Sequence, residues 1–172
     1  MKKNNLILIG FMGVGKGTVA RALVSKHNLF ALDTDDIIES QEKRKIKEIF
    51  KVEGEEYFRN LEQKCADWLE TSVDNTLIST GGGFYKRENI NKIGKVIYLQ
   101  SSFEGILNRI GNSPNAIKKL KKRPLLQDIK EAKKLFDKRI PEYENVADII
   151  VDVEDKDIND IVADIMKKVE VQ

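Results

Sequence analysis

The sequence predicts an α/β protein in which a parallel sheet carries helices on both faces, giving three layers. Short apolar runs alternate along the chain with longer segments in which apolar residues recur at helical spacing. In addition, the first apolar run, residues 6–9, leads into a glycine-rich turn, a lysine and a helical segment. That order is typical of a P-loop, which binds phosphate groups.

Strands and helices can be placed from this pattern. The apolar runs predict strands at residues 5–9, 29–32, 75–80, 95–99 and 147–151. Helical spacing predicts helices at residues 16–26, 36–71, 102–110, 128–143 and 157–169. We expect an interruption of the second helix at residues 52–54, and we expect Pro141 to kink or end the fourth. The chain shows no linker or repeat, which predicts a single domain over residues 1–172.

The composition is that of a globular chain of 172 residues, of which 41% are apolar and 34% charged. Its 30 basic and 28 acidic residues leave a net charge of +2, so we expect no nucleic-acid partner. The single Cys65 excludes an intramolecular disulfide and fits a reducing compartment. The apolar run near the N-terminus is too short for a signal peptide or a membrane span. We therefore expect a cytoplasmic protein with no membrane partner.

The glycine-rich turn, residues 10–18, carries the first candidate site. Glycine lets the backbone wrap a phosphate chain, because no Cβ obstructs it and φ can be positive. The amides of the turn and the N-terminus of the next helix then face the anion, and Lys16 adds a positive charge. A turn that merely links a strand to a helix is the alternative, and the spacing and the lysine argue against it. The predicted nucleotide-binding residues here are Gly13, Val14, Gly15, Lys16, Gly17 and Thr18.

Gly17 departs from the usual pattern of this loop. The residue after the lysine is ordinarily Ser or Thr, whose hydroxyl binds Mg²⁺, whereas here the hydroxyl comes one position later, at Thr18. The Gly-Lys-Gly-Thr form is similar to the loop of adenylate kinases. The metal must therefore be held with help from other groups, and Thr18 is one candidate.

Polar and glycine-rich segments follow two further strands. Residues 33–36 hold three carboxylates directly after the second strand, where α/β sheets bind their ligands. Hard oxygen ligands suit Mg²⁺, and we favour a functional role for this cluster over capping of the next helix. Residues 81–83, three glycines in a row, indicate a backbone that a ligand approaches closely.

Two other patterns have competing interpretations. Residues 118–123 contain five cations, which we interpret as part of a mobile lid over phosphates, because no aromatic residue interleaves them as in a nucleic-acid patch. Pro124 disfavours helical backbone at Arg123. Within the second helix, Arg59 and Glu62 are spaced to pair. The same helix carries an apolar stripe, interpreted as core, of Tyr57, Phe58, Leu61, Cys65, Trp68 and Leu69.

Six segments together resemble the shikimate kinase family, over most of the chain from Leu6 to about Ile150. They are Gly-Phe-Met-Gly-Val-Gly-Lys at 10–16, Asp-Thr-Asp at 33–35, Gly-Glu-Glu-Tyr-Phe-Arg-Asn-Leu-Glu at 54–62, Gly-Gly-Gly at 81–83, Arg-Pro-Leu-Leu at 123–126 and Lys-Arg-Ile-Pro-Glu-Tyr at 138–143. The resemblance implies a P-loop kinase fold of the nucleoside-monophosphate-kinase type, with a five-stranded parallel sheet in the order 2-3-1-4-5. It implies transfer of the γ-phosphoryl group of ATP to the 3-hydroxyl of shikimate, with Mg²⁺, in the synthesis of chorismate and aromatic amino acids.

The resemblance also assigns roles to individual residues. Lys16, Asp35 and Arg123 would be catalytic, and Arg109 would stack on adenine. Asp33 would hold Mg²⁺, with Thr18 as a second candidate. A substrate-binding segment would span residues 34–62, and the lid residues 111–127. The shikimate-binding residues would be Asp35, Arg59, Gly81, Gly82, Gly83 and Arg139, with Glu62 orienting Arg59.

Two alternatives accompany this interpretation. Another small-metabolite kinase of the same fold, such as a gluconate kinase, would lack the pair of carboxylate-binding arginines, Arg59 and Arg139. A non-catalytic nucleotide-binding regulator is suggested only by Gly17. A GTPase is disfavoured because Asn91-Lys92-Ile93-Gly94 lacks the Asp of the guanine-binding motif. We expect a monomer.

Overall fold

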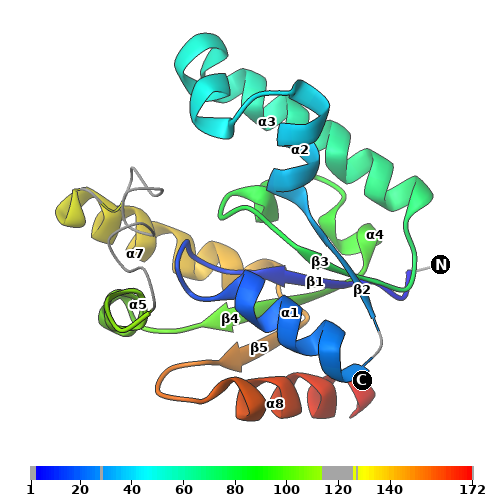
Figure 1. Ribbon diagram of the computed structural model, residues 1–172, viewed down its shortest axis with the longest axis vertical. Coiled ribbons are helices and arrows are strands. Elements are labelled where there is room, and N and C mark those ends of the chain that lie inside the picture. Colours follow the sequence, from blue (N-terminus) through cyan, green and yellow to red (C-terminus); the bar gives the residue numbers. More distant parts are fainter. Residues whose placement is uncertain (1–2, 28, 114–125, 127, 172) are drawn as a thin grey trace.

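The computed structural model describes residues 3–27, 29–113, 126 and 128–171, and its centre is a parallel sheet (Figure 1). The five strands are β1 (Leu6–Ile9), β2 (Phe30–Asp33), β3 (Thr76–Ser79), β4 (Lys95–Gln100) and β5 (Ile149–Asp152). They lie in the order β2-β3-β1-β4-β5, and every pairing is parallel. The predicted sheet and its strand order are confirmed.

Helices cover both faces of the sheet, as predicted. They are α1 (Lys16–His27), α2 (Thr34–Glu42), α3 (Ile46–Ser72), α4 (Ile90–Ile93), α5 (Phe103–Gly111), α7 (Ile129–Val146) and α8 (Ile158–Val171). In Figure 1, α1 and α8 lie side by side on one face of the sheet, whereas α3, α4 and α7 lie on the other face. The short α4 and a 3-10 turn at Phe84–Lys86 were not predicted. No helix within the described ranges combines the length and the apolar character that crossing a membrane requires.

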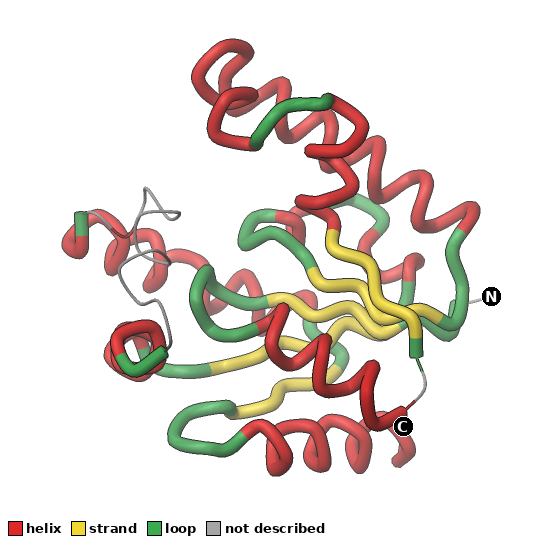
Figure 2. The backbone as a smooth tube through the Cα atoms, in the orientation of Figure 1, coloured by secondary structure: helices red, strands yellow, loops and turns green. Residues whose placement is uncertain are grey.

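The central strand β1 is apolar and almost completely buried, with Ile7, Leu8 and Ile9 exposed by at most 1%. A strand buried on both faces is expected to read as a continuous apolar run, which is what the sequence has there. Because all strands run the same way, the loops that follow them gather beyond one edge of the sheet, where Figure 2 shows them in green. This carboxyl edge positions the candidate site.

The segment after β2 differs from the prediction of one interrupted helix over residues 36–71. The chain forms two helices, α2 and α3, because α2 ends at Lys43 in the left-handed conformation, with φ of 52°. The interruption predicted at residues 52–54 is present, since Gly54 has φ of 86° inside α3. In Figure 1, α2 and the first half of α3 project beyond the sheet.

Two helices differ in part from the prediction. The helix that contains Pro141 runs on to Val146, with the side chains of Arg139 and Tyr143 buried on either side of the proline, so of the two outcomes expected at Pro141 an end of the helix is excluded. In the predicted apolar stripe of α3, Phe58, Cys65 and Leu69 are buried. Tyr57 and Trp68 are instead exposed, by 37% and 44%, because they lie at the margin of the face that packs.

Candidate functional site

The loop between β1 and α1 adopts the backbone shape that phosphate binding requires. Gly10, Gly13 and Gly15 have φ of 146°, 88° and 109°, values that favour glycine. An added Cβ at Gly13 would lie 2.6 Å from Ile110 of α5, so packing also requires this glycine. Helix α1 begins directly after the loop, at Lys16, and its first amides point to the same place.

Lys16 lies across this loop. Its Nζ donates to the backbone oxygens of Gly10, at 2.7 Å, and Phe11, at 3.3 Å. Its charge also acts to lower the pKa of Asp35, against a larger rise that burial causes. Lys16 can therefore act on an anion held by the loop.

The two residues after Lys16 differ in their surroundings. An added Cβ at Gly17 would meet only Arg21 Nη1, at an ordinary contact distance of 3.6 Å, so there is room for a side chain. The hydroxyl of Thr18 accepts a hydrogen bond from Arg21 Nη2 at 3.3 Å. Because a guanidinium stands beside it, Thr18 is less suited to a metal ion than a carboxylate is.

Asp33, the last residue of β2, caps helix α2. Its Oδ1 accepts from the backbone nitrogens of Asp35, at 3.0 Å, and Asp36, at 3.4 Å. The capping role considered for this cluster therefore exists. The cap uses one carboxylate oxygen, and the other can bind a cation.

Asp35 is the acid with the most unusual surroundings. Its Oδ1 is buried and has no hydrogen-bond partner in the described part of the chain. Burial, followed by the charges of Asp33 and Glu62, raises the pKa of Asp35 from 3.8 to about 7, and Lys16 partly opposes this. Such a carboxyl can accept a hydrogen bond from a ligand hydroxyl and exchange a proton with it near neutral pH.

The loop after β3 explains why residues 81–83 are all glycine. Each one lies against a predicted site side chain, closer than a Cβ ordinarily allows. From an added Cβ, the distances are 2.6 Å at Gly81 to Asp35 Oδ1, 3.3 Å at Gly82 to Arg139 Nη1 and 2.5 Å at Gly83 to Arg59 Nη1. A carboxylate and two guanidinium groups thus converge on one short segment of backbone.

Arg59 lies between two carboxylates of its own helix, α3. Its Nη1 binds Glu62 Oε2 at 2.8 Å, which confirms the predicted pair. Glu62 is only 1% exposed. On the other edge of the guanidinium, Nε and Nη2 donate to Glu55 Oε1 at 3.1 Å and 2.9 Å. Glu55 is exposed, so solvent or a ligand can replace it.

Arg139 of α7 is buried, with only 8% exposed. Its Nη1 donates to the backbone oxygen of Gly82 at 3.2 Å, and its guanidinium lies 6.0 Å from the centre of the Phe11 ring. Tyr143, one turn later, donates to the same oxygen at 2.7 Å. These two bonds fix α7 to the glycine segment.

Of the remaining predicted residues, Arg109 lies beside the loop between β1 and α1, and Arg123 lies outside the described ranges. Arg109, near the end of α5, donates through Nη2 to the backbone oxygen of Val153. Its side chain passes 3.8 Å from where a Cβ of Gly15 would stand, beside the phosphate-binding loop. Arg123 and most of the predicted lid, residues 111–127, lie outside the described residues.

Two residues of this neighbourhood had no role in the sequence prediction. Tyr143 holds the glycine segment, and Arg87 donates through Nη1 to the backbone oxygen of Arg59 at 2.7 Å. A lone arginine in a loop and a tyrosine on an apolar helix face are ordinary features of a sequence. Only the three-dimensional fold brings Arg87 and Tyr143 next to the predicted site residues.

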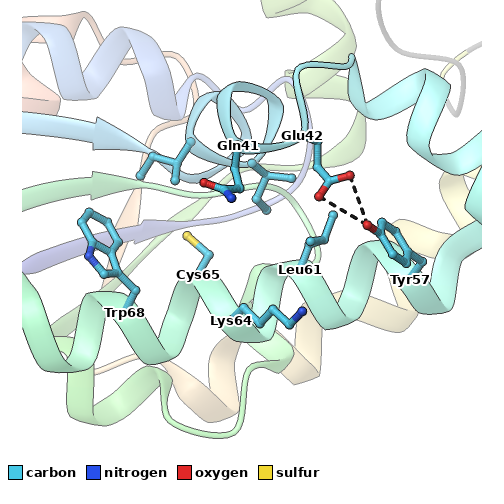
Figure 3. Close-up of a pocket in the computed structure, with 9 residues that line it drawn as sticks. Gln41, Glu42, Tyr57, Leu61, Lys64, Cys65 and Trp68 are labelled. Atoms are coloured by element: carbon cyan, nitrogen blue, oxygen red, sulfur yellow. Dashed lines mark hydrogen bonds between the residues drawn. The ribbon is translucent and has the colours of Figure 1, made fainter.

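The structure contains a separate cavity of about 470 Å³ between α2 and α3 (Figure 3). Tyr57 donates to Glu42 at one end, and Trp68 lies at the other. Burial raises the pKa of the Cys65 thiol to about 12, so this group is protonated at neutral pH. The lining residues, none of them a predicted site residue, are Ile37, Ile38, Gln41, Glu42, Tyr57, Leu61, Lys64, Cys65 and Trp68.

Comparisons with known proteins agree on one family. The sequence model of the family described as shikimate kinase matches residues 12–170. A shikimate kinase of Dictyoglomus turgidum is 37% identical over 171 residues, covering 96% of this chain and 97% of that protein. A shikimate kinase of Helicobacter hepaticus is 40% identical over 147 residues, covering 86% of this chain and 85% of that protein.

Solved structures are similar over the whole fold. The crystal structure of a shikimate kinase from Bacteroides thetaiotaomicron has a TM-score of 0.81 and 28% identity, covering 97% of this chain and 98% of that one. A shikimate kinase from Acinetobacter baumannii, solved in complex with shikimate, has a TM-score of 0.80 and 31% identity, covering 98% of this chain and 94% of that one.

Proposed function

This chain belongs to the shikimate kinase family, and we propose that the side chains at the carboxyl edge of its sheet perform the family's reaction. The reaction transfers the γ-phosphoryl group of ATP to the 3-hydroxyl of shikimate, giving shikimate 3-phosphate and ADP. The chain is accordingly an ATP-dependent kinase of the shikimate pathway. The observation that carries the residue assignment is the convergence of Asp35, Arg59 and Arg139 on residues 81–83.

Arg59 and Arg139 bind the carboxylate of shikimate in this proposal. Planar guanidinium groups match a carboxylate with two parallel hydrogen bonds, and both groups already lie at the same backbone segment. Gly81, Gly82 and Gly83 place their backbone beside the ring of the substrate, where a side chain would intrude.

Asp35 receives the 3-hydroxyl. Its carboxylate accepts the hydrogen bond of the hydroxyl and takes up its proton as the oxygen bonds to the γ-phosphorus. The bond between that phosphorus and the oxygen it shares with the β-phosphate breaks, and ADP leaves with the electron pair. Lys16, whose Nζ lies at the backbone oxygens of Gly10 and Phe11, balances charge on the transferring group.

The nucleotide is held by the loop before α1. The amides of Gly13, Val14, Gly15, Gly17 and Thr18 surround the phosphates, with Lys16 at the β- and γ-phosphates. The left-handed glycines of this loop form a backbone cradle that fits such an anion. Arg109 lies beside the loop, where it can stack on adenine. Arg123 stays a predicted catalytic residue, and it belongs to the undescribed segment.

The donor set fits Mg²⁺ with few protein ligands. Within the described residues, no three acidic, histidine or cysteine side chains are grouped to hold a metal ion. Mg²⁺ commonly keeps several waters and takes only one or two carboxylates besides phosphate oxygens. Asp33 is the carboxylate that would hold it, with Thr18 as the weaker candidate. When bound, the ion neutralises charge on the β- and γ-phosphates.

The same proposal assigns roles to whole segments of the chain. We assign residues 34–62 to substrate binding, because α2 and the first half of α3 carry Asp35 and Arg59. The lid expected at residues 111–127 stays a prediction, because most of these residues lie outside the described ranges, and residues 1–172 act as one catalytic domain in this proposal. We further propose a cytoplasmic protein, since ATP is the co-substrate and Cys65 is a free thiol, and the monomer expected from the sequence stays part of the proposal.

A coupled assay of ADP release, with and without shikimate, tests this function. We expect Mg²⁺-dependent ADP release that requires shikimate, and no stimulation by gluconate, a hydroxylated carboxylate for which the arginine pair is not arranged. Stimulation by gluconate alone would favour a different metabolite kinase. ATP binding without release in either arm would favour a regulator.

A further inference from the structure

The carboxylate of Glu62 interacts with two arginines, Arg59 and Arg87. Its Oε2 lies 2.8 Å from Arg59 Nη1 and 3.9 Å from Arg87 Nε. The first distance is a charge-assisted hydrogen bond, whereas the second is too long for a hydrogen bond and leaves charge attraction. With 1% of Glu62 exposed, little solvent screens either contact. A single buried carboxylate therefore balances two guanidinium groups.

Arg87 is tied to Arg59 by a second, independent contact. It follows the 3-10 turn Phe84–Lys86 and reaches back to α3, where its Nη1 donates to the backbone oxygen of Arg59 at 2.7 Å. Its side chain is 11% exposed. Arg87 thus contacts both the backbone of Arg59 and the carboxylate that binds the Arg59 side chain.

The surroundings of Arg87 are unfavourable for a charge that serves only stability. Its Nε is buried without a hydrogen-bond partner among the described residues. Burial lowers its pKa, opposed by Glu62. Burying an incompletely paired guanidinium is costly, and an apolar residue of similar volume is often as stabilising. The presence of a charge at this position is explained if the charge acts on Arg59.

We propose that Arg87 is a positioning residue for the shikimate carboxylate, acting on Arg59 through Glu62 and through the Arg59 backbone. With Glu62 shared between two cations, the Nη1 edge of Arg59 stays fixed at Glu62 and against Gly83. Its Nε–Nη2 edge is then presented in one orientation to the substrate. This inference rests on the proposed role of Arg59.

The test replaces Arg87 by Met, which keeps an unbranched apolar stem and removes the charge. We expect KM for shikimate to rise roughly tenfold, the size of one charge-assisted hydrogen bond. KM for ATP should stay within about twofold, because the phosphate-binding loop is untouched. Lys168→Met is the matched control: Lys168 also contacts a backbone oxygen, that of Ile150, and a carboxylate, Asp164, but on α8, outside the segments assigned to the site. It should leave both KM values unchanged.

A double-mutant cycle separates positioning from general destabilisation. If Arg87 acts through Arg59, adding Arg87→Met to Arg59→Leu should not raise KM for shikimate further. If Arg87→Met does not fold, Arg87→Lys takes its place, and a KM for shikimate raised at least about threefold with KM for ATP unchanged supports the inference.

Two results would overturn the inference. One is an unchanged KM for shikimate in a folded Arg87 variant. The other is an effect that simply multiplies with that of Arg59→Leu. Failure of the proposed function looks different, because Arg59→Leu itself would then leave KM for shikimate unchanged.

Discussion

Gly81 and Asp35 form one packed contact: a Cβ added to Gly81 would stand 2.6 Å from Asp35 Oδ1. Gly81→Ala must therefore displace the carboxylate, and we expect kcat to fall roughly a hundredfold, as for other misplaced catalytic groups. KM for ATP should change little. Steady-state kinetics together with a thermal melt check this, and a folded variant with normal kcat would contradict the role of Asp35.

The pH dependence of the reaction should report Asp35. Because its pKa in the free protein is about 7, kcat/KM for shikimate should fall as the pH drops below about 7 and the carboxyl becomes protonated. Asp35→Asn should lower kcat strongly and remove this acidic limb. A limb that survives in the variant would belong to another group.

The same shift predicts a pH-dependent effect on stability. The pKa of Asp35 is higher in the folded state than its usual 3.8, so its contribution to stability is full below pH 3.8 and is lost as the pH rises towards about 7. Asp35→Asn should therefore raise Tm more at about pH 8 than at about pH 5. Thermal melts at the two pH values measure the difference.

Arg59 and Arg139 should affect shikimate and not ATP. Changing either to Leu removes a charge-assisted contact worth about 1.5–3 kcal/mol, which corresponds to at least about a tenfold rise in KM for shikimate. KM for ATP should stay nearly constant. Equal loss of affinity for both substrates would mean that the two arginines support the fold.

Glu55 should compete with the substrate. Its carboxylate occupies the Nε–Nη2 edge of Arg59, and because it is exposed the pair is worth little stability. Glu55→Gln should lower KM for shikimate about twofold without reducing Tm. The exposed neighbour Glu56, changed to Gln, is the control and should have no effect. A raised KM would show that Glu55 orients Arg59.

The substitution Gly17→Ser restores the hydroxyl that this kind of loop usually carries. The position has room for a side chain, so Gly17→Ser should fold and should lower the Mg²⁺ concentration for half-maximal rate. The change should be modest, since one neutral ligand replaces a water that already binds well. Thr18→Val tests the alternative ligand and should raise the Mg²⁺ requirement clearly if Thr18 holds the ion.

The sheet and the loops at its carboxyl edge could be predicted because their signals are local. Apolar runs mark the strands, and glycines mark the turns that follow them. The break between α2 and α3 carried no such signal, since Lys43 takes the left-handed conformation where Gly or Asn is usual. The exposure of Trp68 was also hidden, because spacing shows which residues share a helix face and not how far the neighbouring helix covers it.

The site was predictable to the extent that its residues follow strands or belong to recognisable segments. Arg87 reaches Arg59 across 28 positions of sequence, and Tyr143 reaches Gly82 across 61. Such contacts depend on how α3 and α7 pack on the sheet. Sequence spacing within one helix could predict the Arg59–Glu62 pair but could not predict these longer links.

The cavity between α2 and α3 is lined by an intrinsic fluorophore. Its wall holds Trp68, the single tryptophan of the chain, with 44% of its surface exposed. Asp35 lies in the first turn of α2, and Arg59 lies on α3, nine residues before Trp68. If shikimate binds to both groups as proposed, it bridges the two helices that form the cavity, and we expect the wavelength and intensity of the Trp68 emission to change on binding.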